Sequence, residues 1–426
     1  MNVVVVGGGA AGTIAALVAK KMGADVTLIR KDKEFFVKCS SPYVISGDVE
    51  YEKALKPDSM LTSNGVRLII DEVVDVDTEK KIVKTQNLQF FYDKLIMATG
   101  AKPFVPPMKI SGNVFTLRDG DDVKKIMEAS NGANKIAVIG GGAIGIELAS
   151  EFKKMGKDVM IIELLDHLME RVYDSEFCDK IEKILKEKRI DIHTSTKVQS
   201  IENGKIITDK GTFDADLTVL SIGVRAETEL AKKIGLNVDK GIVVDDKMQT
   251  SMKDIYAAGD CAQYVSMIDG KPVPSQIAST AVIEGKIAAI NACGGNVSLN
   301  GLTNPIVSEI FGTPIGRVGF NEIDCKRSGI EYKIGYAKSM NKYDSEKDAK
   351  PLEVKLIFEK NTGVIIGAEM IGANIAERID LISLAMQKKA TMNELSIMNY
   401  CAHPKLTPLP FMDPIVMASD DAMNKN

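Results

Sequence analysis

The chain has 426 residues, of which 45% are hydrophobic and 26% are charged, and its formal net charge is −4. This composition is ordinary for a folded globular protein with sizeable cores and excludes a largely disordered chain. The slightly acidic balance and the lack of a long basic run exclude nucleic acid as the main partner. The length corresponds to roughly three domains.

Six cysteines are spread along the chain, at positions 39, 178, 261, 293, 325 and 401. They form no Cys-x-x-Cys pair and match no zinc-site spacing, so we expect no metal. Few cysteines in a long chain without a secretion signal indicate a reducing, cytoplasmic environment. The uncharged run over 3–19 contains bunched glycines and no preceding basic segment, which predicts a strand and a turn rather than a membrane segment.

The chain contains an internal repeat, because residues 2–30 resemble residues 135–163. Each segment predicts a buried Val/Ile strand, a glycine turn, a helix and a second strand. The similarity continues in 91–103 and 213–226, where an apolar strand leads to Gly100 and to Gly223, respectively. We therefore predict an α/β fold with two Rossmann-like nucleotide-binding domains, the first interrupted by the second.

After the second unit, a strand over 241–246 and a helix over 275–292 return the chain to the first domain. Strands over 351–358 and 364–372 and an amphipathic helix over 374–389 then predict a C-terminal α+β domain. The predicted boundaries are 1–108 with 237–303 for the first domain, 109–236 for the second and 304–426 for the third.

Each nucleotide-binding unit carries a Gly-x-Gly-x-x-Gly loop between its first strand and its helix. The first glycine permits the tight turn, the second lets the backbone approach a pyrophosphate, and the third lets helix and strand pack closely. The helix N-terminus attracts the phosphate charge. The predicted loop contacts are Gly7, Gly9, Ala11 and Gly12 in the first unit and Gly140, Gly142, Ile144 and Gly145 in the second.

The two units differ at the end of the second strand. Glu163 can accept hydrogen bonds from both ribose hydroxyls of an adenosine, and its charge would repel a 2′-phosphate, so we expect NADH over NADPH there. The first unit has Arg30 at the matching place, followed by Lys31. These two residues either contact the adenosine or a phosphate, or are solvated charges at a strand end.

The order of these motifs, together with Ala98-Thr99-Gly100 and the segment TSMKDIYAAGDCA over 250–262, resembles the flavoprotein pyridine nucleotide–disulfide oxidoreductases over nearly the whole chain. The resemblance implies FAD in the first unit, NADH in the second and a homodimer formed by the C-terminal domain. It also implies that Asp260 contacts the ribityl and phosphate region of the flavin and that Glu147 faces the nicotinamide. Further cofactor contacts implied in this way are Val73, Thr99, Gly100, Gly223 and Gly259.

The segment Lys38-Cys39-Ser40-Ser41-Pro42-Tyr43 resembles the single-cysteine branch of this family, which includes coenzyme A-disulfide reductases, NADH oxidases, NADH peroxidases and persulfide reductases. A thiolate attacks disulfides and peroxides, and Lys38 or a helix start would favour the thiolate. A lone cysteine is often only a small buried hydrophobic residue. In this segment we expect Cys39 to be redox-active, through a mixed disulfide or a sulfenic acid.

The segment NYCAHPKLTP over 399–408 combines features of single-cysteine and two-cysteine relatives. The resemblance implies that it reaches the flavin and cysteine of the other subunit. His403 is then a candidate general acid toward a leaving thiolate, although Pro408 stands where relatives have an acid. Tyr43 is a candidate hydrogen-bond donor to an intermediate, and Cys401 is either a second redox thiol or a small neighbour.

We therefore predict an FAD-dependent NADH oxidoreductase that reduces a small disulfide or persulfide through Cys39, with coenzyme A as a candidate substrate or bound thiol. Two alternatives stay open. One is an NADH oxidase or peroxidase that uses a sulfenic acid on Cys39. The other is an NAD-linked flavin electron-transfer subunit of a larger complex. We expect a cytoplasmic homodimer without nucleic-acid or membrane partners.

Overall fold

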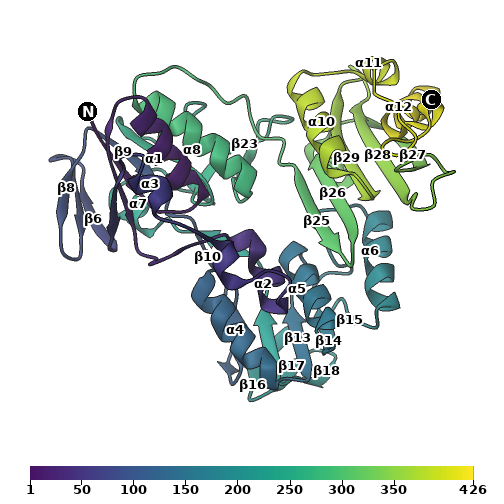
Figure 1. Ribbon diagram of the computed structural model, residues 1–426, viewed down its shortest axis with the longest axis horizontal. Coiled ribbons are helices and arrows are strands. Elements are labelled where there is room, and N and C mark those ends of the chain that lie inside the picture. Colours follow the sequence, from purple (N-terminus) through teal and green to yellow (C-terminus); the bar gives the residue numbers. More distant parts are fainter. Residues whose placement is uncertain (426) are drawn as a thin grey trace. The chain divides into compact units, whose positions relative to one another are not determined.

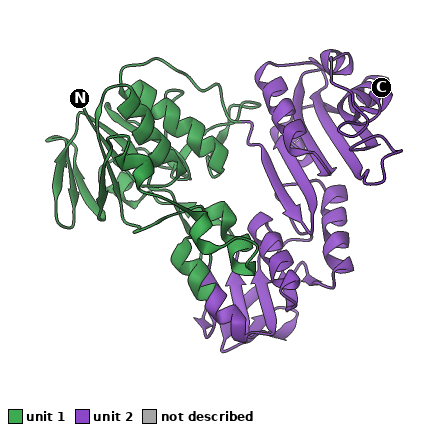
Figure 2. Cartoon of the chain, viewed as in Figure 1, with its two compact units in different colours: residues 1–105, 117–126, 223–302 green, residues 106–116, 127–222, 303–426 purple. Residues whose placement is uncertain are grey.

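The computed structural model describes residues 1–425, whose helices and strands are labelled in Figure 1. The chain divides into two compact units, coloured in Figure 2. Unit 1 comprises 1–105, 117–126 and 223–302, and unit 2 comprises 106–116, 127–222 and 303–426. The finer division into three domains stays a prediction. Among residues 1–425, no helix is both long and apolar enough to cross a membrane.

The centre of unit 1 is a parallel five-stranded sheet in the order β22-β9-β1-β2-β5. Val3, Val5, Leu95 and Ile96 in this sheet are 0% exposed, as expected for parallel strands covered on both faces. Its strands are β1 (Asn2–Val6), β2 (Asp25–Arg30), β5 (Arg67–Ile70), β9 (Lys94–Met97) and β22 (Ile255–Ala257).

Two helices of unit 1 pack closely against each other, α1 (Ala10–Lys21) and α8 (Ala278–Ala292). A Cβ at Gly285 would lie 2.3 Å from the carbonyl oxygen of Ala11, so only glycine permits this approach. The helix predicted over 275–292 is confirmed, and it begins at Ala278 because Ile277 has an extended backbone.

Smaller elements complete unit 1. The strand predicted over 241–246 is confirmed only over β21 (Ile242–Val243), which pairs with β23 (Ala262–Val265). The segment from Lys38 to Tyr43, which contains Cys39, lies in a 3-10 turn, η1 (Lys38–Ser40), and in the following α2 (Ser41–Ser46). The remaining strands are β3 (Phe35–Phe36), β4 (Leu55–Lys56), β6 (Val73–Asp77), β7 (Ile82–Thr85), β8 (Gln89–Phe91), β10 (Ala101–Pro103), β20 (Val224–Ala226) and β24 (Pro272–Pro274). The remaining helices are η2 (Tyr51–Ala54), α3 (Ser59–Thr62) and α7 (Glu229–Lys233).

Unit 2 contains a second parallel five-stranded sheet, in the order β12-β19-β13-β14-β15. Its strands are β12 (Val114–Thr116), β13 (Lys135–Ile139), β14 (Asp158–Ile162), β15 (Asp191–His193) and β19 (Leu217–Leu220). The associated helices are α5 (Ala143–Lys154) and α6 (Ser175–Glu187), while α4 (Gly120–Gly132) begins in unit 1. A smaller sheet holds β11 (Ile110–Ser111), β16 (Val198–Glu202), β17 (Lys205–Thr208) and β18 (Gly211–Asp214).

The strand register confirms the internal repeat. Val6 pairs with Ile29 in unit 1, and Ile139 pairs with Ile162 in unit 2. The N–H of Gly7 donates to the carbonyl of Ile29 at 2.8 Å, and the N–H of Gly140 donates to the carbonyl of Ile162 at 2.9 Å. Arg30 and Glu163 therefore occupy equivalent positions.

The C-terminal part of unit 2 is an antiparallel sheet in the order β25-β26-β29-β28-β27, with helices in the same segment, which confirms the predicted α+β architecture. The strands predicted over 351–358 and 364–372 are β28 (Pro351–Glu359) and β29 (Ile365–Gly372), and the predicted amphipathic helix is α10 (Ala376–Gln387). The other elements are β25 (Ile306–Ile310), β26 (Thr313–Gly319), β27 (Tyr332–Met340), α9 (Glu322–Ser328), α11 (Met392–Ser396), η3 (Pro410–Met412) and α12 (Pro414–Asn424).

Candidate functional site

The first glycine loop is tight on one side and open on the other. A Cβ at Gly7, whose φ is +112°, would lie 2.0 Å from the carbonyl oxygen of Ala98. A Cβ at Gly12 would lie 1.9 Å from the carbonyl oxygen of Gly7. Around Gly9, by contrast, no described residue other than its two chain neighbours comes within 4 Å of such a Cβ. The loop packs on the sheet and leaves its second glycine accessible, as a pyrophosphate contact requires.

The second loop repeats this geometry in unit 2. A Cβ at Gly140 would lie 2.4 Å from the carbonyl oxygen of Ser221, and one at Gly145 would lie 2.0 Å from the carbonyl oxygen of Gly140. Gly142, like Gly9, has no neighbour within 4 Å of its Cβ position among residues 1–425. Ile144 lies on the same helix start and is 47% exposed.

Both helices that follow these loops begin without a side-chain cap from the described residues. Gly9 is the N-cap of α1 and Gly142 is the N-cap of α5, and neither first turn contains an acid. First-turn N–H groups have no partner inside a helix, so they can donate to phosphate oxygens, and the helix dipole favours the phosphate charge. The two loops therefore fit the pyrophosphates of two dinucleotides.

Asp260 lies in a turn directly after β22, at the carboxyl end of the first sheet. Its Oδ2 accepts a hydrogen bond from Nη2 of Arg118 at 2.9 Å, and the two side chains are 23% and 19% exposed. The backbone of Gly259, before it, has a φ of +79°. Ligands of open α/β sheets bind at this end of the strands, so the pair is well placed to hold a cofactor.

Arg118 is a site residue that sequence reasoning missed. It lies 142 positions before Asp260, and no local spacing marks the pairing. The only local signal is its place directly before the acidic start of α4, at Asp119, Asp121 and Asp122.

Arg30 is a buried residue fixed in the loop after β2. Its side chain is 3% exposed, so the interpretation as a solvated charge is wrong for this residue. Nε donates to the carbonyl of Asp32 at 2.9 Å, and Nη2 donates to the carbonyl of Lys33 at 2.9 Å and to Asp58 at 2.7 Å. Nη1 is buried and has no hydrogen-bond partner within residues 1–425, which leaves its two N–H groups for a bound group.

The other predicted contacts of the first dinucleotide are spread around the same sheet. Lys31 is exposed just after β2, and Val73 is half-buried at the start of β6. Thr99 and Gly100 follow β9, where the Thr99 hydroxyl donates to the carbonyl of Glu227 at 2.7 Å. Unit 1 therefore brings the first loop, Arg30, Thr99 and Asp260 to one sheet, and their contacts with a cofactor stay predictions.

Cys39 is exposed, in the middle of η1. The interpretation as a small buried hydrophobic residue is therefore wrong. Loss of hydration at the ammonium group lowers the pKa of the neighbouring Lys38. The positive charge of Arg118 lowers this pKa further, while the negative charge of Asp260 raises it. These interactions link the cysteine segment to the Arg118–Asp260 pair. Tyr43 is half-buried one turn later in α2, which is too short to supply a strong helix dipole.

In unit 2, Glu163 contacts the second glycine loop directly. Its Oε2 accepts from the N–H of Gly141 at 2.6 Å, and its Oε1 accepts from the N–H of Leu165 at 2.8 Å. A carboxylate oxygen has two lone pairs, so both oxygens can still accept from a ribose. The following Leu164 is 58% exposed and offers no cation to a 2′-phosphate.

Glu147 lies in α5 beside the second loop and next to β25. Burial raises the pKa of its carboxyl group to about 7, although hydrogen bonds with Ser308 and the backbone of Glu309 lower it. Gly223, predicted from the repeat, is exposed after β19 and belongs to unit 1.

His403 lies in an exposed turn of unit 2. Its Nδ1 accepts a hydrogen bond from the N–H of Lys405 at 3.3 Å, which in the neutral ring leaves the proton on Nε2. Cys401 is exposed in the same segment. Since Cys39 belongs to unit 1, a meeting of His403 and Cys39 stays a prediction.

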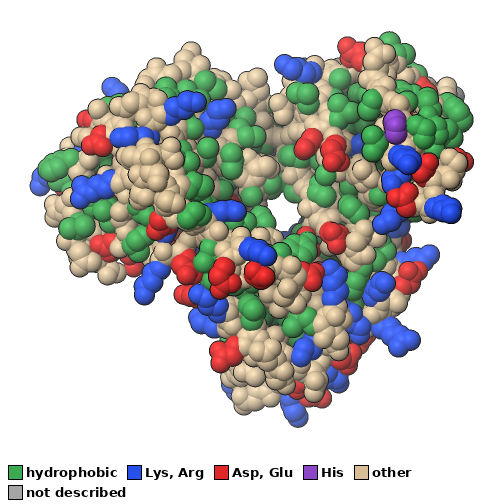
Figure 3. Space-filling view, in the orientation of Figure 1, with side chains coloured by type: hydrophobic (Ala, Val, Ile, Leu, Met, Phe, Trp, Pro, Cys, Tyr) green, Lys and Arg blue, Asp and Glu red, His purple; other side chains and the backbone are tan. Residues whose placement is uncertain are grey.

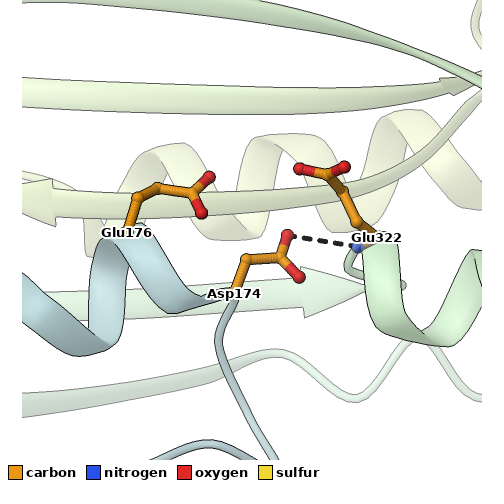
Figure 4. A group of neighbouring side chains, drawn as sticks. All are labelled: Asp174, Glu176 and Glu322. Carbon is orange, nitrogen blue, oxygen red and sulfur yellow. Dashed lines mark hydrogen bonds between the residues drawn. The ribbon is translucent and has the colours of Figure 1, made fainter. Parts of the chain in front are cut away.

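A separate acidic cluster in unit 2 has the spacing of metal ligands but is occupied by a lysine. Oxygens of Asp174, Glu176 and Glu322 lie within 4.8 Å of one another (Figure 4). Nζ of Lys355 lies between 2.5 and 2.7 Å from all three. Burial alone would lower the pKa of Lys355, but these hydrogen bonds raise it above its ordinary value. The cluster is therefore a buried ion-pair network.

Residues 1–285 match the family described as pyridine nucleotide-disulphide oxidoreductase, and residues 308–409 match the dimerisation domain of the same family. The chain is 32% identical over 448 residues to an NADH oxidase of Methanocaldococcus jannaschii, covering 100% of this chain and 99% of that protein. It is 29% identical over 436 residues to a CoA-dependent NAD(P)H sulfur oxidoreductase of Pyrococcus abyssi, covering 98% of this chain and 97% of the relative.

Among solved structures, the chain is similar to an NAD-dependent persulfide reductase from A. fulgidus, with a TM-score of 0.95 and 30% identity, covering 100% of this chain and 83% of that one. The two glycine loops, the two parallel sheets and the C-terminal antiparallel sheet agree with these matches. The chain therefore belongs to the pyridine nucleotide-disulphide oxidoreductase family and is an NAD(P)H-dependent flavin oxidoreductase.

Proposed function

We propose that this chain uses FAD and NADH to reduce a small disulfide or persulfide, with Cys39 as the attacking thiol. The observation that carries the proposal is an exposed cysteine whose neighbour Lys38 interacts with the Arg118–Asp260 pair. The CoA-dependent sulfur oxidoreductase and the persulfide reductase among the similar proteins support a sulfur substrate, with coenzyme A as a candidate part of it.

In the proposed reaction, the Cys39 thiolate attacks one sulfur of the substrate. The S–S bond of the substrate breaks, a mixed disulfide forms on Cys39, and the departing thiolate takes up a proton. A His403 ring that carries a proton on both nitrogens would supply this proton from Nε2 across the dimer and return to its neutral form. The first loop, Asp260 and Arg118 would hold FAD, which would pass on the two electrons from NADH. With two protons from solvent, these electrons would return the mixed disulfide to two thiols.

Glu163 supports NADH as the electron donor. Its carboxylate stands at the end of β14 and is held by two backbone N–H groups. A ribose with free hydroxyls can donate to this carboxylate, whereas a 2′-phosphate would meet a like charge.

A homodimer is supported by exposed hydrophobic side chains in and beside the segment that matches the dimerisation domain. Ile397 is 82% exposed, Leu406 is 68% exposed and Phe411 is 76% exposed. Figure 3 shows hydrophobic side chains gathered on this part of unit 2. Burying such apolar surface against a second copy is favourable, and it would bring the His403 segment into the interface.

The second candidate function is an NADH oxidase, favoured by the 32% identity to the M. jannaschii protein of that name. In that case a peroxide transfers one oxygen atom to the Cys39 thiol, which becomes a sulfenic acid while the rest of the peroxide leaves as water or an alcohol. Two electrons from NADH and two protons would then return the sulfenic acid to the thiol and release water.

The test is anaerobic NADH consumption by the wild type with CoA disulfide, CoA persulfide or hydrogen peroxide, and aerobic consumption without them. We expect the fastest turnover with a CoA sulfur substrate and its loss in Cys39→Ser, with Cys401→Ser as the matched control. Turnover with oxygen or peroxide alone would favour the second candidate. Full activity of Cys39→Ser would contradict both and favour an electron-transfer subunit.

A further inference from the structure

Glu284 is a buried carboxyl group that the proposed chemistry does not use. It is 0% exposed in α8, where Gly285 brings the helix against Ala11 at the start of α1. Its Oε2 accepts a hydrogen bond from the N–H of Gly259 at 2.8 Å. Its Oε1 is buried and finds no partner within residues 1–425. Glu284 thus reaches the turn that presents Asp260.

This turn depends on the acceptor that Glu284 provides. Gly259 has a φ of +79°, and a Cβ there would lie 2.8 Å from the Cβ of Ala11, so the turn is pressed against α1. A buried N–H in such a turn needs an acceptor, because an unpaired one is costly. Through this contact α8 fixes the backbone from which Asp260 reaches Arg118.

The helices and strands around Glu284 bring no counter-ion to it in the described part of the chain. The basic residues of α1, Lys20 and Lys21, lie in its last turn, at the far end from Ala11. On β9, Lys94 is paired with Asp254 at 2.5 Å. On β22, the sequence Ile-Tyr-Ala carries no charge.

Burial and the charge of Asp260 disfavour the ionised form of Glu284, whereas the hydroxyl of Ser275 and the N–H of Gly259 favour it. Asp260 repels a second negative charge, and Arg118 is already paired with Asp260. The hydroxyl of Ser275, which is 0% exposed, is the remaining polar neighbour. Burial is the largest of these effects, so the neutral carboxylic acid is favoured at pH values below about 7.

We propose that Glu284 is a positioning residue for FAD binding, which as a neutral carboxylic acid holds the Gly259–Asp260 turn in the conformation that FAD requires. This inference rests on the FAD site of the proposed function. Burial, with a smaller contribution from the Asp260 charge, raises the pKa of Glu284 to about 7. Ionisation would add a negative charge beside Asp260 and near the FAD phosphates, so FAD affinity should fall as the pH rises from 6 to 8.5.

The experiment dilutes the full-length holoenzyme and follows FAD release by fluorescence, which gives a dissociation constant at each pH. Glu284→Gln keeps a neutral acceptor for the Gly259 N–H, whereas Glu284→Leu removes it. Asn291→Leu is the matched control, because Asn291 also lies buried in α8 but bonds the carbonyls of Lys247 and Val297. Thermal unfolding of each variant reports its folding.

We expect Glu284→Leu to weaken FAD binding by about tenfold or more, the effect of leaving one buried donor unpaired. Asn291→Leu should lower the unfolding temperature without weakening FAD binding. Glu284→Gln should bind FAD as tightly as the wild type at pH 6. At pH 8.5 it should keep this affinity, whereas the wild type should bind FAD more weakly.

Tight FAD binding by Glu284→Leu, or the same pH dependence in Glu284→Gln and the wild type, would overturn the inference. If Glu284→Leu does not fold, the pH dependence of Glu284→Gln decides alone. Failure of the wild type itself to retain FAD would instead refute the proposed function.

Discussion

Glu163 and Arg30 occupy equivalent positions in the two repeats, and their hydrogen bonds run in opposite directions. Glu163 accepts from the N–H groups of Gly141 and Leu165, at 2.6 and 2.8 Å. Arg30 donates to the carbonyls of Asp32 and Lys33, both at 2.9 Å. One strand–turn–helix design therefore places a hydrogen-bond acceptor at the end of the second strand in one unit and a donor at the same position in the other.

Glu163 should set the preference for NADH. We expect Glu163→Ala to raise KM for NADH by about tenfold to a hundredfold, the value of a hydrogen bond to a charged group, with little change in kcat. KM for NADPH should change less, because the repulsion of the 2′-phosphate is lost together with the ribose contact.

Asp166→Asn is the control for Glu163→Ala. It removes the same charge three residues further along, from an exposed side chain that bonds only Ser195 among the described residues. Steady-state kinetics with both nucleotides check the prediction. A wild type that prefers NADPH, or an equal effect of the two substitutions, would contradict it.

Arg30 should contribute to the adenosine half of the first dinucleotide site. We expect Arg30→Met to weaken FAD binding by about tenfold, since a buried, charge-assisted donor is lost. FMN lacks the adenosine half, so its binding to the FAD-free protein should not change.

Asp58→Asn serves as the control for Arg30→Met, because it removes the 2.7 Å ion pair of Arg30 and keeps the guanidinium. Equilibrium titration of the FAD-free protein with FAD and with FMN measures both effects. If Arg30→Met weakens FMN binding as much as FAD binding, Arg30 acts only by holding the loop.

The sequence predicts the parts of this protein whose signals are local. The repeat, both glycine loops, β28, β29 and α10 follow from periodicity and from glycine spacing, which depend on neighbouring residues only. The resemblance of its segment predicts a redox role for Cys39, and the exposure of this side chain agrees with a reactive thiol.

The contacts that sequence reasoning missed join residues far apart in the chain. Arg118 meets Asp260 across 142 positions, and Lys355 meets Asp174 across 181. A lysine in a β-strand is normally predicted to be exposed. Lys355 in β28 is buried because α6 and α9 pack near this strand. Pairings of this kind depend on the tertiary fold and leave no spacing to detect.

Asp254 should stabilise unit 1 at neutral pH and lose this effect in acid. Its carboxylate pairs with Lys81 at 2.7 Å and Lys94 at 2.5 Å, and hydrogen bonds from these lysines lower its pKa to about 2. The pKa of this carboxyl group is lower in the folded state than in the unfolded chain, so its ionised form stabilises the folded state at pH values above the unfolded-state pKa. This stabilisation is lost as the pH falls toward the folded-state pKa.

We therefore expect Asp254→Asn to lower the free energy of unfolding by about 1–2 kcal/mol at pH 7. This difference from the wild type should shrink below about pH 4. The φ of +69° at this position suits asparagine, so the backbone is not strained. Urea unfolding at several pH values measures the difference. Lys94→Met should show the same pH dependence, and a cost of Asp254→Asn that is constant down to pH 3 would contradict the prediction.

Lys355 should be the main stabilising residue of the acidic cluster in unit 2. Its side chain is 2% exposed and pairs with Asp174, Glu176 and Glu322, so Lys355→Met removes the positive charge that these three carboxylates share. Breaking a buried ion pair by removing one partner costs about 3–5 kcal/mol. Lys360→Met, which breaks a surface pair with Glu331, should cost less than about 1 kcal/mol.

The same cluster gives a test for metal binding. In the wild type the ammonium group of Lys355 fills the space between the three carboxylates, so millimolar Ca²⁺ should not raise the unfolding temperature. Lys355→Ala vacates that space and leaves oxygen ligands at the spacing of a cation site, so Ca²⁺ should recover part of the lost stability. Calcium stabilisation of the wild type equal to that of Lys355→Ala would show that the cluster binds metal in the native protein.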